Sequence, residues 1–148
     1  MEIQPDFKEL LKSFNARKVD FLIVGAYALA LHGLPRATGD MDLLVKPDKQ
    51  NAMKILAALG DFGFGSLGLK EEDFFQPERV VQLGVPPVRV DILSGISGVS
   101  WEQAWDGRVP GRYGDEPVFF LGRKQMVENK RAAGRKKDLA DLESLGES

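Results

Sequence analysis

The hexapeptide DMDLLV at residues 40–45 constrains the fold most, because two carboxylates one residue apart lead directly into an aliphatic run. A short apolar run of this kind predicts a buried β-strand. Side chains at i and i+2 of a strand point to one face, so Asp40 and Asp42 project together while Met41 and Leu43 face the core. Two such carboxylates repel each other, and one is pushed toward its neutral form unless a cation is present. The segment therefore predicts a sheet with an acidic, cation-binding face.

A third acid has the same setting, because Asp91 lies inside the aliphatic segment VRVDIL. If that strand lies beside the first, three acids meet at one point. Mg²⁺ takes oxygen ligands, usually one or two carboxylates together with phosphate oxygens and water. Two simpler interpretations stand beside this one. An isolated Asp-x-Asp most often forms a turn or a helix cap, and Asp91 could simply pair with Arg89.

The rest of the chain alternates helical and strand patterns, which predicts one mixed α/β domain over residues 1–148. Residues 61–77 are expected to form a long loop or lid that Phe74 and Phe75 anchor. The tail, over about residues 122–146, is expected to be helical and to be interrupted or bent near Gly134. The other expected helices cover residues 5–19, 26–31, 47–60 and 101–105. The expected strands cover 20–25, 40–45, 79–84 and 88–93, with a hairpin or a pair of edge segments over 108–122.

Composition excludes several classes of protein. The 148-residue chain has no cysteine, so it has no disulfide framework, no thiolate metal site and no cysteine nucleophile. Its apolar stretches are too short to span a bilayer, and its first residues lack the basic and apolar regions of a signal peptide. We therefore expect a cytoplasmic protein with no membrane partner.

Charge is distributed unevenly along the chain. The net charge is −2, yet residues 123–137 contain seven basic side chains and one acidic side chain, Glu128. This asymmetry predicts an anionic partner near the C-terminal end. The alternative is a basic helix face that is merely solvated.

The segment VGAYALALHG places Gly25 between a predicted strand and a predicted helix. A glycine there lets the backbone approach a phosphate closely, and the helix N-terminus offers free N–H groups. Neither a dinucleotide-binding fingerprint nor a P-loop is present. A glycine required only for packing is the competing interpretation.

In this order, Gly25-Ala26, GLPRATGDMDLLV, Asp91 and the tail segment ENKRAAGRKKDLADLESL resemble the minimal nucleotidyltransferases of the DNA polymerase beta-like superfamily. Within it, the AbiEii-type bacterial toxin nucleotidyltransferases look most similar, over roughly residues 18–145. The resemblance implies a nucleotidyltransferase fold, with a small mixed β-sheet flanked by helices and a helical tail. It also implies transfer of a nucleoside monophosphate from a nucleoside triphosphate to an acceptor hydroxyl, with release of pyrophosphate.

The resemblance also implies roles for individual residues. Asp40 and Asp42 would be ligands of Mg²⁺, or of Mn²⁺ in its place. Asp91 would be the third acid, which serves as a further ligand or helps to deprotonate the acceptor. Ala26 stands where Ser or Gly is often found, so backbone donors must serve the phosphates there. The nucleotide-binding residues implied are Gly25, Ala26, Arg36, Thr38, Lys130, Lys137 and Asp138.

Lys130 and Lys137 are seven residues apart, so they would share one face if the helix continued past Gly134. The acceptor implied by the resemblance is RNA, tRNA or a protein. A toxin–antitoxin role, with a cognate toxin or antitoxin as partner, is also implied. The alternative function is a catalytically inactive nucleotide-binding or partner-binding module with the same fold. A plain interaction domain with a basic tail is a third possibility.

Overall fold

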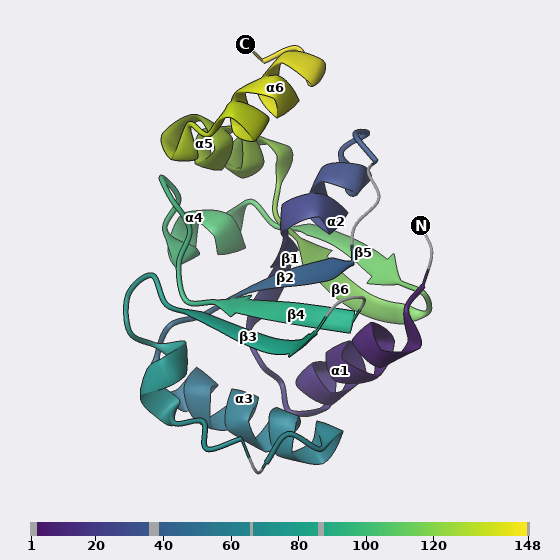
Figure 1. Ribbon diagram of the computed structural model, residues 1–148, viewed down its shortest axis with the longest axis vertical. Coiled ribbons are helices and arrows are strands. Elements are labelled where there is room, and N and C mark those ends of the chain that lie inside the picture. The colour runs from purple at the N-terminus through teal and green to yellow at the C-terminus, as the bar shows by residue number, and fades with distance from the viewer. Residues whose placement is uncertain (1–2, 36–38, 66, 86–87, 148) are drawn as a thin grey trace.

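The structure, a computed structural model, describes residues 3–35, 39–65, 67–85 and 88–147. Within these residues, six strands form one mixed sheet in the order β3-β4-β2-β1-β6-β5, and helices flank it (Figure 1). The strands are β1 (Phe21–Val24), β2 (Asp40–Val45), β3 (Val80–Val85), β4 (Val88–Leu93), β5 (Val109–Tyr113) and β6 (Glu116–Phe120). The helices are α1 (Pro5–Ala16), α2 (Gly25–Leu31), α3 (Lys49–Phe62), the 3-10 helix η1 (Glu71–Phe74), α4 (Trp101–Asp106), α5 (Arg123–Ala133) and α6 (Lys136–Ser144).

The centre of the sheet is its most buried part. All four residues of β1 are buried, as expected for a strand covered on both faces. β1 runs antiparallel to β2 and parallel to β6, and β2 runs parallel to β4. β3 and β5 pair antiparallel with β4 and β6 and form the two edges.

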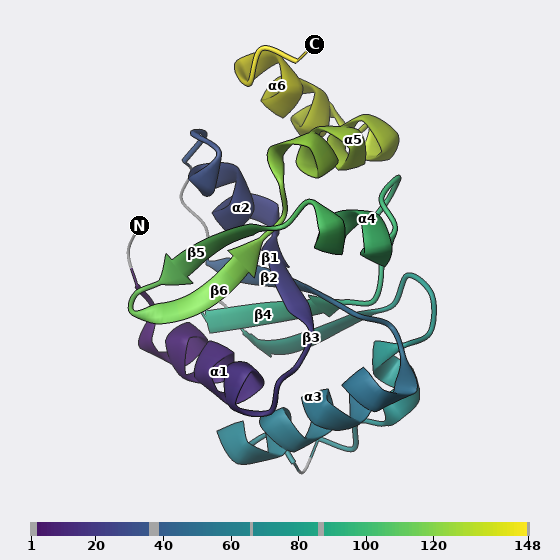
Figure 2. The same cartoon turned by 180° about the vertical axis from the view of Figure 1, so that it is seen from behind.

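One face of the sheet is packed against α1 and α3, which contact each other below it (Figures 1 and 2). The apolar stripe of α1 is fully buried there: Phe7, Leu10, Leu11 and Phe14. The other face is only partly covered. In both views α2 lies on it near β1, and α5 and α6 lie beyond. Side chains of the sheet and of the tail line a cleft over this face, so part of it stays open.

Most of the predicted elements are confirmed, and β2 has its predicted bounds. α3 begins and ends two residues later than expected, and it ends later because the left-handed glycine that follows it is Gly63 and not Gly60. The predicted loop contains η1, whose Phe74 is buried as an anchor. No helix among the described residues has the length and apolarity needed to cross a bilayer.

The tail consists of two helices. Gly134 adopts a left-handed conformation with φ of 63°, which ends α5 and starts the turn into α6. Lys130 is therefore on α5 and Lys137 on α6. The expected interruption near Gly134 is confirmed, so the condition under which the two lysines would share one helical face is not met.

Candidate functional site

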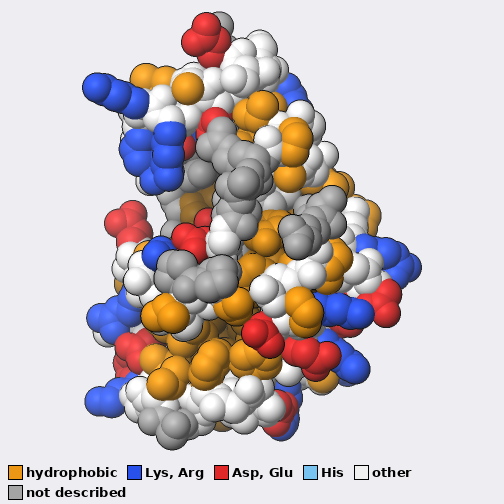
Figure 3. Space-filling model, turned by 45° about the vertical axis from the view of Figure 1, so that its right-hand side comes forward, with side chains coloured by type: hydrophobic (Ala, Val, Ile, Leu, Met, Phe, Trp, Pro, Cys, Tyr) orange, Lys and Arg blue, Asp and Glu red, His pale blue; other side chains and the backbone are white. Residues whose placement is uncertain are grey.

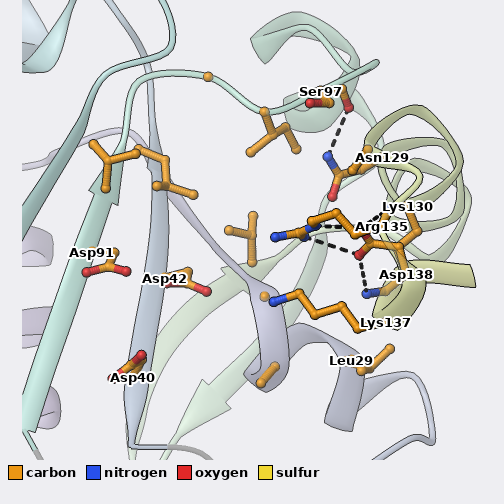
Figure 4. Close-up of a pocket in the computed structure, with 18 of the residues that line it drawn as sticks. Leu29, Asp40, Asp42, Asp91, Ser97, Asn129, Lys130, Arg135, Lys137 and Asp138 are labelled. Atoms are coloured by element: carbon orange, nitrogen blue, oxygen red, sulfur yellow. Dashed lines mark hydrogen bonds and ion pairs between the residues drawn. The ribbon is translucent and has the colours of Figure 1, made fainter. Parts of the chain in front are cut away.

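The three predicted acids lie side by side on the open face of the sheet. The parallel register of β2 and β4 places Asp42 opposite Asp91 and Asp40 opposite Arg89. Neighbouring strands are about 4.8 Å apart, and residues i and i+2 share a face. The strand of Asp91 therefore lies next to the strand of Asp40 and Asp42 (Figure 4). This is the condition on which the predicted site depends.

A cleft of about 850 Å³ lies over these acids, between the sheet and the tail. In Figure 3 the surface is hollowed at this level, with acidic side chains on the sheet side and basic ones on the tail side. Arg36 and Thr38 lie outside the described residues. Every other predicted site residue lines the cleft: Gly25, Ala26, Asp40, Asp42, Asp91, Lys130, Lys137 and Asp138.

Gly25 is needed at its position for two independent reasons. Its φ is +69°, a left-handed conformation that favours glycine. A Cβ atom built on Gly25 would also overlap the carboxylate of Asp42. The glycine at the junction of β1 and α2 thus lets the backbone pass directly beside the central acid.

Asp42 has the most perturbed electrostatics of the acids in the cleft. Burial, followed by the negative charges of Asp91 and Asp40, raises its pKa from 3.8 to about 6, although the charges of Arg89 and Lys137 oppose this rise. Each of these effects follows from placing a carboxylate among others in a half-buried position. Among the described residues, the positive charges near Asp42 therefore do not outweigh its burial and the two neighbouring carboxylates.

Asp91 is held by Arg89, as the simpler interpretation of the sequence predicted. The Arg89 Nε donates to Asp91 Oδ1 at 3.0 Å, and its second terminal nitrogen lies 2.8 Å from Oδ2. The same guanidinium lies 3.8 Å from Asp40. Such a two-pronged pair fixes the orientation of the carboxylate. Any binding of a metal by Asp91 would have to use the lone pairs that Arg89 leaves.

The cleft contains carboxylate oxygens that could bind a divalent cation, but these oxygens do not form a complete metal site. Within the described ranges, no group of three or more His, Cys, Asp or Glu side chains has an arrangement that could hold a metal ion. Asp40 and Asp42 nevertheless project to the same face, and the raised pKa of Asp42 shows that a positive charge there would be favourable. These two carboxylates are the candidate ligands.

On the tail side, Lys130 and Asp138 belong to a buried ion network that joins α5 to α6. The Lys130 Nζ lies 2.8 Å from Asp141 Oδ2 and 3.6 Å from Asp138 Oδ1, and Arg135 Nε lies 2.6 Å from Asp138 Oδ2. The side chain of Asp138 is 1% exposed. Burial alone would raise its pKa, but hydrogen bonds from Arg135 and the charge of Lys130 outweigh burial and lower it. Both residues line the cleft, yet their charges are already engaged.

Lys137 is different. It is exposed on α6 and makes no ion pair with any other residue that the structure describes. Figure 4 shows its side chain extended toward Asp42, and its charge acts on the pKa of that acid. Among the predicted tail residues, it is the one with a charge available to a ligand.

Sequence reasoning missed part of the lining. Asp141 follows Asp138 by three residues, a spacing that places both on one helical face and could have indicated the network. Asn129, which donates from Nδ2 to the carbonyl of Ser97 at 2.9 Å, gave no sequence signal. Other lining residues that were not predicted are Glu78, Gln82, Arg135 and Ile96.

No protein-family model matches the sequence, and no curated protein matches it either. Solved structures do match. TM1012 from Thermotoga maritima, a candidate nucleotidyltransferase, superposes with a TM-score of 0.62 at 17% identity, covering 99% of this chain and 97% of that one. The lincosamide antibiotic adenylyltransferase LnuA, in a structure with bound lincomycin, has a TM-score of 0.55 at 12% identity, with 97% and 96% coverage.

A third match is the antibiotic-resistance factor ANT(2'')-Ia, with a TM-score of 0.56 at 13% identity, covering 95% of this chain and 80% of that one. At such identities, likeness of structure establishes the fold alone. The chain accordingly has the mixed α/β fold of these nucleotidyltransferases.

Proposed function

We propose that the protein is a nucleotidyltransferase that moves a nucleoside monophosphate from a nucleoside triphosphate to an acceptor hydroxyl and releases pyrophosphate. The row of three acids on the cleft floor, beside the Gly25 turn, is the observation that carries this proposal. The shared fold with nucleotidyltransferases supports it.

Each group in the cleft has a role in this proposal. Asp40 and Asp42 would hold Mg²⁺, or Mn²⁺ in its place, and the bound ion would offset the negative charge of the phosphates. The backbone of Gly25 and Ala26 would face the triphosphate, and Lys137 would contact its oxygens from the tail side. Asp91, whose orientation Arg89 fixes, would accept the proton of the acceptor hydroxyl. Such a site accelerates the reaction mainly through positioning and charge compensation.

The direct test is transfer of label. The full chain is incubated with each α-labelled nucleoside triphosphate, Mg²⁺ and separate RNA, protein and small hydroxyl acceptors, and both label transfer and pyrophosphate are measured. Asp42→Asn keeps the shape of the side chain but removes its charge. We expect the rate of transfer to fall at least a hundredfold, which is the order of magnitude for the loss of one electrostatic contact to a transition state. Asp106→Asn, at an exposed site on α4 outside the cleft, is the control. Equal transfer by Asp42→Asn and the wild type would contradict the proposal.

Lys137 provides a second test, which concerns the nucleotide. Lys137→Ala should raise KM for the triphosphate by about fivefold, because an exposed cation contributes about 1 kcal/mol to a phosphate contact. Its melting temperature should stay unchanged, since the side chain has no ion pair to lose within the described structure. Lys136→Ala is the matched control, because Lys136 is equally exposed but does not line the cleft. An equal KM for both variants would remove Lys137 from the nucleotide site.

The second candidate function is a nucleotide-binding module without turnover. The paired state of Asp91 and the lack of a hydroxyl at Ala26 favour it. Nucleotide binding without pyrophosphate release would identify this case. An AbiEii-type toxin–antitoxin role with a cognate partner protein, and a cytoplasmic location, are narrower proposals that rest on the sequence alone.

A further inference from the structure

The cleft floor has two chemically different ends. One row of residues crosses four strands in register: Val24 of β1, Asp42 of β2, Asp91 of β4 and Gln82 of β3. The Gly25 turn directly follows the β1 end of this row. The β3 end is an edge of the sheet. A substrate on one side of the acids is therefore in a different environment from a substrate on the other side.

The geometry of phosphoryl transfer assigns a reactant to each end. The attacking oxygen and the leaving oxygen lie roughly in line on opposite sides of the phosphorus. In the proposed reaction the triphosphate lies against the Gly25 turn and Lys137, so pyrophosphate leaves toward β1 and the tail. The acceptor hydroxyl must then approach from the β3 side, over Asp91.

Within the part of the chain that the structure describes, the β3 side carries no cation that is available to an acceptor. Among the described lining residues there, the one basic side chain is Arg89, and its guanidinium is paired with Asp91. Glu78 is exposed at this end and makes no ion pair with another described residue. Val80, which is 50% exposed, provides an apolar surface at this end of the cleft. The lining at this end is Glu78, Val80, Gln82, Leu93, Gly95 and Ile96.

The basic run of the tail does not supply a track for a polyanion either. Four of its seven cations are paired with acids of the tail itself: Arg123, Lys130, Arg131 and Arg135. Residues 123–147 contain five acids, so their net charge is +2. Nucleic acids are held by several free cations that contact successive phosphates. The observed pairing leaves too few such cations beside the acceptor end.

We propose that the acceptor is a small hydroxyl compound that carries a positive charge. This inference rests on the proposed function. The acceptor oxygen forms a bond to the α-phosphorus, and the bond from that phosphorus to the bridging oxygen breaks. Pyrophosphate leaves with the electron pair, and Asp91 takes the hydroxyl proton. The body of the acceptor lies on Val80, and its cationic group pairs with Glu78.

Three sugars that differ mainly in charge test this assignment, together with RNA. The full chain, Mg²⁺ and α-labelled triphosphates are incubated separately with glucosamine, glucose, glucose 6-phosphate and total RNA. We expect kcat/KM for glucosamine to exceed that for glucose by about tenfold, with no label on the anionic sugar or on RNA. Preferential labelling of RNA or glucose 6-phosphate, or equal use of glucosamine and glucose, overturns the acceptor assignment and leaves nucleotidyl transfer intact. Absence of label on every acceptor contradicts the proposed function itself.

A variant at Glu78 separates recognition of charge from general effects on the cleft. Glu78 has a φ of +55°, and glutamine has the same backbone strain in this conformation as glutamate. Glu78→Gln therefore changes the charge alone. We expect KM for glucosamine to rise about fivefold while KM for the triphosphate stays unchanged. Glu102→Gln, on the exposed side of α4 outside the cleft, is the control. An unchanged KM for glucosamine in Glu78→Gln removes the carboxylate from acceptor recognition and overturns the proposal.

Discussion

Asp42→Asn should stabilise the protein while it abolishes transfer. Asp42 is half-buried beside two other acids, and its pKa is raised from 3.8 to about 6. A raised pKa means that the folded state binds the proton more tightly than the unfolded state. Above pH 6, where the side chain is ionised in both states, its charge therefore opposes folding. Asparagine has the shape of the protonated acid and carries no charge.

The magnitude follows from the rise in pKa. Each pKa unit corresponds to about 1.36 kcal/mol, so the rise from 3.8 to about 6 corresponds to about 3 kcal/mol at pH 8. Water and salt in the open cleft screen part of this, and we expect Asp42→Asn to gain about 2 kcal/mol at that pH. As the pH falls, protonation removes the charge of Asp42 in the wild type. The stability gain of Asp42→Asn should therefore be about half as large at pH 5 as at pH 8.

Urea unfolding at pH 8 and pH 5, in EDTA, measures the free energy of unfolding of both proteins. Asp106→Asn serves as the control and should differ from the wild type by less than about 0.5 kcal/mol. Addition of MgCl₂ should then stabilise the wild type but not Asp42→Asn, because a ligand stabilises only a protein that binds it. If Asp42→Asn were no more stable than the wild type at pH 8, or if its advantage did not depend on pH, the electrostatic reasoning would be refuted.

Three further substitutions test the surroundings of the cleft by urea unfolding. Gly25→Ala should lower the free energy of unfolding more than Gly33→Ala, because both glycines have positive φ but only Gly25 lies against a carboxylate. We expect a loss of about 2 kcal/mol for Gly25→Ala and about 1 kcal/mol for Gly33→Ala, and equal losses would contradict this reasoning. Asp138→Asn should cost about 2 kcal/mol at pH 7. Because the pKa of Asp138 is lowered, this difference should vanish as the pH falls below about 4, and a constant difference would argue against the ion network. Arg89→Gln should lower the free energy of unfolding, and most of this loss should be recovered when Asp91→Asn is added, whereas additive losses would mean that the pair is not coupled.

Local patterns were sufficient to predict most of the elements. The strand at residues 40–45 is specified by its own aliphatic run, and the bounds of β2 agree with it. The end of α3 was misplaced because Gly60 and Gly63 are both plausible stops, and the choice depends on which one adopts the left-handed conformation. That choice is made by tertiary packing, which a single sequence does not show.

The site was predictable only up to the order of the strands. The sequence shows that Asp40 and Asp42 share a face, but the position of Asp91 beside them depends on β4 pairing with β2 in a particular register. Strand order and register are set by long-range packing. For the same reason the sequence did not indicate that Glu78 and Gln82 line the cleft at its β3 end.

The buried and half-buried acids that the structure describes differ in how their charges are balanced. Arg89 compensates Asp91, and Lys130 compensates Asp138 and Asp141. Asp42 has no such partner among the described residues, and its pKa is the one raised to about 6. A structural ion network supplies a counter-charge for each buried acid, because an uncompensated one destabilises the fold. Among the described residues, Arg89 and Lys137 offset the charge of Asp42 only in part. A cation bound from solution would therefore favour the ionised form of Asp42, which supports the proposed site for a cation and its nucleotide.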